Sequence, residues 1–148
     1  MDTRTTVQSL MDAVQMGKFE SAKSYLARNF TFSGPLPQPI SGEEWIDMSA
    51  NMKVAFPDLN YRFKIESVDG DTAHISGELS GTHKGTIDLT SMHMGKIPAT
   101  GKSFKAARQR GNVTVHDGKV TAWAMEPTEG ADLMDILGQL GVKIPHVA

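Results

Sequence analysis

The 148-residue chain contains no cysteine. Disulfides, thiol nucleophiles and thiolate metal sites are therefore excluded from any account of its fold or chemistry. The sequence also lacks an apolar run long enough to cross a bilayer, and its first ten residues lack the charged-then-apolar layout of a signal peptide. We therefore expect a cytoplasmic protein that does not associate with membranes.

An excess of charge of one sign is lacking as well, because 15 basic and 17 acidic residues give a formal net charge of −2, and no long basic run occurs. Nucleic-acid binding through phosphate neutralisation therefore has little support. The sequence has no glycine-rich phosphate loop and no Gly-x-Ser-x-Gly nucleophile motif, and its five histidines show no paired metal-site spacing. We expect neither a cofactor nor a metal, and one domain over residues 1–148.

What is present begins with helical patterns. Apolar residues recur at helical spacing over residues 3–16, and a shorter helical segment follows over residues 19–26. The third helix has the clearest start, because Ser41 and Glu44 have the spacing of a capping box. This helix is predicted to run to about residue 55, with Trp45 and Met48 on its buried face.

After the third helix the apolar period changes to two, which indicates strands. Asp-Gly turns join neighbouring strands into hairpins. The predicted strands cover residues 59–66, 73–79, 102–116 and 119–126, and a helix over residues 133–140 ends the pattern. Helices followed by antiparallel strands predict an α+β fold in which the helices cover one face of a sheet.

The longest predicted strand changes phase along its length. Phe104 occupies an even position and Val113 an odd one, with Gly111 between them, which predicts a β-bulge at Gly111. Such a bulge would turn Arg108 and Arg110 into the interior, where they would need a carboxylate or an anionic ligand. In the alternative interpretation, both arginines lie on the outer face in solvent.

Two histidines are candidate proton carriers, because imidazole titrates near neutral pH. His83 and His93 belong to a glycine-broken segment, residues 77–104, which we expect to form the mouth of a pocket. The alternative is that each is a solvated loop residue. Glu126, at the end of the last predicted strand, is a further acid–base candidate.

Four segments in chain order resemble the SnoaL-like polyketide cyclase and ester cyclase family of the nuclear transport factor 2-like superfamily. They are AFPDLNYRF at residues 55–63, GTHKG at 81–85, IPATGK at 97–102 and VHDGKV at 115–120. The resemblance implies a strongly bent sheet that wraps the N-terminal helices and leaves a cone-shaped pocket. It also implies a homodimer formed through the outer face of the sheet.

Related enzymes of that superfamily commonly place an Asp, Glu or His near a Trp on the last strand. Around Trp123 this chain offers only Glu126, because the neighbouring side chains carry no titratable proton.

Two hypotheses about function follow. The first is a cofactor-free isomerase, cyclase or dehydratase that acts on a small hydrophobic carbonyl or anionic compound, with Glu126 or His83 as acid and base. The second is a non-catalytic module of the same fold that serves small-molecule binding or dimerisation. The expected pocket residues are Arg108, Arg110, His93, Trp45, Met48 and Ala124.

Overall fold

The structure of the protein, a computed structural model, describes residues 2–34, 38–89, 95–126, 128 and 133–141. The helices are α1 (Thr3–Gln15), α2 (Phe19–Ser24), α3 (Gly42–Ala55) and α4 (Leu133–Gln139). The strands are β1 (Leu26–Ser33), β2 (Ile40–Ser41), β3 (Lys64–Asp69), β4 (Thr72–Gly77), β5 (Ser80–Thr82), β6 (Ile87–Leu89), β7 (Gly95–Ile97), β8 (Ser103–Lys105), β9 (Gln109–His116) and β10 (Lys119–Met125). None of the described helices has the length and hydropathy needed to cross a membrane.

Two helices, α1 and α3, begin where a polar side chain caps them. The Asp2 carboxylate accepts a hydrogen bond from the Thr5 backbone N–H at 2.7 Å and starts α1. At α3 the Ser41 hydroxyl and the Glu44 carboxylate each accept a hydrogen bond from the other residue's N–H, so the predicted capping box is confirmed. These caps fix where α1 and α3 begin.

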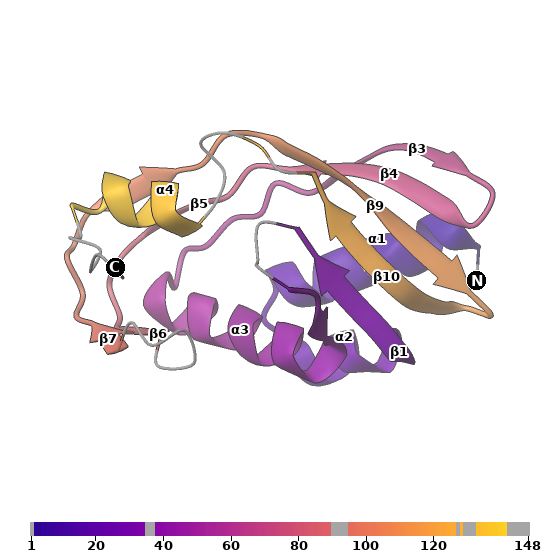
Figure 1. The fold of residues 1–148 in the computed structure, drawn as a ribbon, viewed down its shortest axis with the longest axis horizontal. Coiled ribbons are helices and arrows are strands. Elements are labelled where there is room, and N and C mark those ends of the chain that lie inside the picture. Colours follow the sequence, from indigo (N-terminus) through magenta and orange to yellow (C-terminus); the bar gives the residue numbers. More distant parts are fainter. Residues whose placement is uncertain (1, 35–37, 90–94, 127, 129–132, 142–148) are drawn as a thin grey trace.

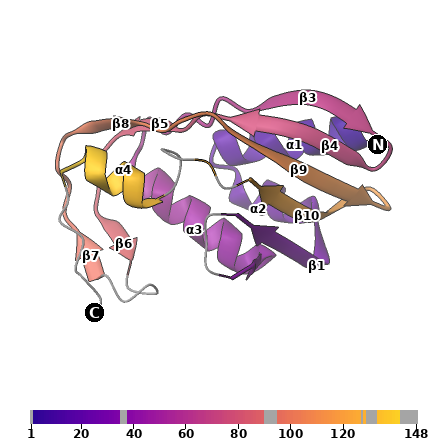
Figure 2. The ribbon, with the colours of Figure 1, turned by 45° about the horizontal axis from the view of Figure 1, so that its top comes forward.

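Six strands form the main sheet in the order β2-β1-β10-β9-β4-β3. The β1–β10 pair is parallel and the others are antiparallel. Figure 1 shows α1, α2 and α3 on one side of this sheet, with α4 at the end remote from the N-terminus. There the sheet continues into the β5–β8 ribbon, beside the β6–β7 hairpin (Figure 2). The predicted α+β cone fold is therefore confirmed.

The prediction of a single strand over residues 102–116 is wrong, because the chain forms two strands, β8 and β9, with residues 106–108 between them. β8 pairs with β5, whereas β9 pairs with β4 and β10. Buried positions are even at Phe104 and Ala106 and odd from Gln109 onward, while Ala107 and Arg108 are both exposed. The change of phase therefore occurs where the chain passes from one ladder to the other.

The bulge predicted at Gly111 is also wrong. On both sides of β9 the register runs without a shift through Gly111, which pairs with Ile75 of β4 and Met125 of β10. The irregularity is in β10, where Thr121 is the extra residue opposite β9. A Cβ at position 111 would lie 2.4 Å from the Ala124 carbonyl oxygen. Glycine is needed here for a close approach of strands.

The core between α3 and the sheet centres on Trp45, which is 5% exposed. Its ring centroid lies 5.2 Å from that of Trp123 on β10, and 5.4 Å from that of Phe30 on β1. The predicted buried position of Trp45 is therefore confirmed. A second apolar cluster at the far end joins the last turn of α3 to α4 through Phe56, Phe104 and Leu137.

Replacing Trp45 by alanine would leave a cavity between α3 and the sheet. We expect Trp45→Ala to lower the free energy of unfolding by about 3–5 kcal/mol, the usual cost of truncating a buried large aromatic. Urea denaturation followed by circular dichroism measures this change. Val54→Ala on the same helix is the matched control, because Val54 is 65% exposed and should change stability by less than about 0.5 kcal/mol. Equal effects of the two substitutions would contradict the placement of α3.

Candidate functional site

The concave side of the sheet is aromatic where it faces α3. The rings of Tyr61 and Phe63 stack with centroids 4.8 Å apart, and the Phe63 centroid lies 5.4 Å from that of Trp123. Trp45 closes the group from the helix side. These rings pack against one another and give the concave side an apolar, aromatic lining.

Three neutral polar side chains accompany these rings. The Ser49 hydroxyl, on α3, donates to the Trp45 carbonyl at 2.8 Å, and the Gln109 amide, on β9, donates to the Glu126 carbonyl at 3.0 Å. Burial raises the pKa of Tyr61 to about 12, although the Ser49 hydroxyl partly opposes the rise. Tyr61 is therefore an uncharged hydrogen-bond donor at neutral pH.

No Asp, Glu, Lys or Arg occurs among the buried residues of the described chain. The buried polar side chains there are Thr6, Ser49, Ser76, His83 and Gln109. An unpaired charge in such surroundings would be costly. The interior therefore suits an uncharged ligand better than a carboxylate or a phosphate.

His83 lies in this buried set, in the loop after β5, and is fully inaccessible to solvent. Its Nδ1 atom accepts a hydrogen bond from the Thr100 backbone N–H at 3.2 Å and lies 2.9 Å from the Thr100 hydroxyl. An acceptor Nδ1 places the ring proton on Nε2, which has no hydrogen-bond partner within the described residues. The interpretation of His83 as a solvated loop residue is therefore wrong.

The charge state of His83 follows from its surroundings. Burial, beside the Phe56 ring at 5.4 Å, lowers the pKa of His83 below its usual value of 6.5, and the Gly85 backbone partly offsets this. The imidazole is therefore neutral at pH 7. Its proposed catalytic role remains a prediction.

The two arginines expected in the interior lie on the opposite face. Because the β9 ladder is regular, Arg108 and Arg110 alternate with the buried Gln109 and point away from the helices, and both are exposed. Their predicted entry into the pocket is wrong. Glu126 is likewise exposed and follows β10 on the outer side, and its catalytic role stays a prediction.

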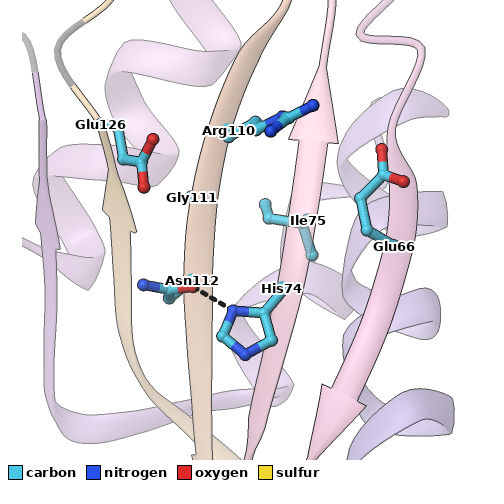
Figure 3. A pocket seen from close by; sticks show the side chains of 7 residues that line it. All are labelled: Glu66, His74, Ile75, Arg110, Gly111, Asn112 and Glu126. Carbon is cyan, nitrogen blue, oxygen red and sulfur yellow. Dashed lines mark hydrogen bonds between the residues drawn. The ribbon is translucent and has the colours of Figure 1, made fainter.

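An open hollow of about 340 Å³ lies on this outer face. It is lined by Glu66, His74, Ile75, Arg110, Gly111, Asn112 and Glu126 (Figure 3). His74 and Asn112 are hydrogen-bonded at 2.7 Å, and Arg110 extends across β4 toward Glu66. The Ser76 hydroxyl lowers the pKa of Glu66, and the charges of Lys64 and Arg110 add to this effect. The hollow is thus polar and charged, unlike the concave side.

The remaining expected pocket residues divide between the two faces. Met48 is partly buried and packs against the core beside Trp45, as predicted for its helix face. Ala124 alternates with the inward Trp123 and pairs with Asn112, so its expected place in the interior is wrong. His93 lies outside the described residues.

Sequence reasoning did not single out Tyr61, Ser49 or Gln109 as site residues. Tyr61 stands in the alternating apolar segment before β3, and a hydroxyl within such a segment is a signal that could have found it. Ser49 lies one position after Met48 on α3 and offers no comparable signal. No group of three or more His, Asp or Glu side chains in the described chain could hold a metal ion.

The buried His83 makes stability depend on pH. Below pH 6.5 the unfolded chain binds a proton at this position that the folded chain rejects, so the free energy of unfolding falls as the pH drops from 6.5 toward the lower folded-state pKa. Urea denaturation at pH 7.5 and 5.5 measures the difference. We expect a smaller difference in His83→Gln and an unchanged one in the control His116→Gln, since His116 is exposed at the β9–β10 turn. An unchanged difference in His83→Gln would contradict the prediction.

Comparisons with known proteins agree with this arrangement. The sequence profile described as SnoaL-like polyketide cyclase matches residues 5–140. No curated protein matches the chain. The structure is similar to that of IdmH from Streptomyces antibioticus, a candidate polyketide cyclase, with 21% identity, a TM-score of 0.72 and coverage of 96% of this chain and 100% of the other.

Two further structures have the same fold. A candidate SnoaL-like polyketide cyclase from Jannaschia sp. CCS1 is 20% identical, with a TM-score of 0.71 and coverage of 95% of this chain and 92% of the other. A LEH-like epoxide hydrolase from M. tuberculosis is 16% identical, with a TM-score of 0.61 and coverage of 93% and 84%. These identities establish the fold alone, whereas the profile spans nearly the whole sequence. The chain therefore belongs to the SnoaL-like polyketide cyclase family.

Proposed function

We propose that the chain binds a small, uncharged hydrophobic molecule that carries a carbonyl group, on the concave side of the sheet. The observation that carries this proposal is the neutral character of the buried polar groups. A phenol with a pKa of about 12 stays protonated at neutral pH and can donate a hydrogen bond to a carbonyl oxygen. The aromatic side chains beside Tyr61 supply the apolar contact.

An anionic ligand at this place has less support. Arg108 and Arg110 lie on the outer face, and the described buried residues include no cation that would pair with a carboxylate. Membership of the SnoaL-like family supports a small organic ligand in general. The choice of an uncharged carbonyl compound rests on the interior of this chain alone.

Acid–base catalysis without a cofactor is a second candidate function, and it rests on His83. Its Nε2–H is buried without a partner in the described chain. A carbonyl oxygen that reached it could accept a hydrogen bond that stabilises the enolate oxygen, while a water molecule takes the ketone's α-proton. We do not assign the acid–base role to Glu126, because it lies on the outer face. Exchange of a bound ketone's α-protons into D₂O would favour the enzyme, and binding without exchange would favour a binding module.

The binding proposal is tested with a ketone and a matched hydrocarbon. We expect 2-acetylnaphthalene to quench the emission of the buried Trp45 and Trp123 saturably. Tyr61→Phe should weaken ketone binding about fivefold, the loss of one ordinary hydrogen bond, and leave 2-ethylnaphthalene binding unchanged. Tyr25→Phe is the control, because Tyr25 lies at the C-terminal end of α2. If Tyr61→Phe weakened the binding of the ketone and the hydrocarbon equally, Tyr61 would not be the hydrogen-bond donor to the carbonyl group.

We also propose that two copies pair through the outer face of the sheet. The motivation is the mixed polar and small-residue composition of that face, where Thr114 and Asn112 of β9 pair with Ala122 and Ala124 of β10. Trp123 of β10 is buried in the core and does not belong to this face.

Light scattering at micromolar concentration tests the pairing. We expect a mass of twice the 16.1 kDa of the chain. Thr114→Arg should halve it, because a two-fold axis brings the same surface of both copies together. Asn51→Arg on the exposed side of α3 should not change the mass. A monomeric mass for the unmodified chain would rule the pairing out.

A further inference from the structure

The main sheet passes into the β5–β8 ribbon through a bend (Figure 2). Charged side chains gather on the outer side of this bend. Three chain segments meet at this bend. The Glu78 N–H donates to the Tyr61 carbonyl and the Ala106 N–H donates to the Leu79 carbonyl, each at 2.8 Å. Since Tyr61, Leu79 and Ala106 pack into the interior, their neighbours along each segment point outward.

Arg62, Glu78 and Lys105 are such neighbours, and Arg108, which precedes the buried Gln109, is exposed as well. The group therefore consists of one carboxylate and three cations. Glu78 lies 3.1 Å from the Lys105 ammonium, 3.6 Å from the Arg62 guanidinium and 3.7 Å from that of Arg108. Three positive charges and one negative charge leave a local excess of two positive charges. The whole chain, by contrast, has a formal net charge of −2.

Glu78 does not use up the hydrogen-bonding capacity of these cations. Its distances to the two guanidinium groups exceed the range of a hydrogen bond, and only the lysine is within it. In the described chain, the Arg62 guanidinium donates no hydrogen bond and that of Arg108 donates only to the Ser76 hydroxyl. Each guanidinium has five N–H donors, so most of them remain available to a ligand.

The cations are also held in place before any ligand arrives. The fully buried Ser76 hydroxyl accepts from Arg108 at 2.8 Å and donates to Glu66 at 2.7 Å. The Gln139 side chain of α4 bonds both backbone groups of Lys105. Arg62 has a φ of 45°, and its N–H donates to the Asn60 side chain at 2.9 Å. Ordering of this kind reduces the entropy lost on binding.

We propose that Arg62, Lys105 and Arg108 form a binding site for a dianion of the phosphate class. Guanidinium groups match the oxygen geometry of phosphate, and a phosphate monoester carries about −1.5 to −2 charge at pH 7, which balances the local excess. Glu78 holds the cations together and competes with the ligand for them. This site lies on the face opposite to the carbonyl site and shares no residue with it.

Inorganic phosphate is the first probe, followed by calorimetry at constant ionic strength balanced with sodium chloride. We expect saturable binding that Lys105→Gln weakens about two- to fivefold, the scale of one exposed ionic contact. Lys64→Gln is the matched control. Lys64 and Lys105 each pair with one glutamate and have side chains that are 67% exposed, but only Lys105 belongs to the cluster. Absence of saturable binding, or equal weakening by both substitutions, would overturn the proposal.

Glu78→Gln distinguishes a binding site from a network that serves stability alone. Removing the competing carboxylate should tighten phosphate binding about two- to fivefold, although it removes three ionic contacts from the fold. Weaker or unchanged binding by the folded variant would count against the site. If Glu78→Gln does not fold, as judged by circular dichroism, Arg62→Gln takes its place and must weaken binding.

Phenyl phosphate is the second probe, because free phosphate and a phosphate ester share the same head group. Tighter binding of the ester would assign the site to an organic phosphate, and equal binding would assign it to inorganic phosphate. Tyr61→Phe should leave both affinities unchanged. Failure of this site therefore leaves the carbonyl-binding proposal untouched, and failure of that proposal leaves this site untouched.

Discussion

The packing of Trp45 on Trp123 is the contact on which the rest of the structure depends. It joins α3 to β10 at 5.2 Å between ring centroids, and β10 in turn joins β1 to β9. With this contact in place, β10 presents its indole side to the helices and its alanines to the opposite face. The chemical difference between the two faces of the sheet follows from that orientation.

That difference separates neutral from charged groups. Among the described residues, the polar groups toward the helices include a phenol, hydroxyls and an amide, and His83 is held neutral by burial. Away from the helices stand the arginines, lysines and glutamates of β3, β4 and β9 with their flanking segments. Because burying a charge is costly and exposing it is not, alternation along each strand is enough to produce this separation.

The sequence predicted the elements whose signals are local. The Ser41–Glu44 capping box lies within four residues, and it placed α3 and the buried side of Trp45 correctly. The prediction that Arg108, Arg110 and Ala124 face the interior was wrong, because it depended on where a ladder shifts its register. That position depends on the partner strand: the glycine that looked like a bulge permits a close approach, and the bulge lies at Thr121. The burial of His83 could not be predicted from the loop sequence around it either. The residues that contact its ring, Thr100 and Phe56, come from distant segments of the chain.

The extra residue at Thr121 has a consequence for how such a site can change over time. The residues of β10 after Thr121 stay on their present faces of the sheet only while Thr121 is present. A slip of one position would exchange the two faces of the strand. A deletion of a single codon there would turn Trp123 and Met125 outward and bring Ala124 and Glu126 toward the helices. Gaining an interior carboxylate would then take one length change rather than a new side chain, at the expense of the tryptophan contact that holds α3.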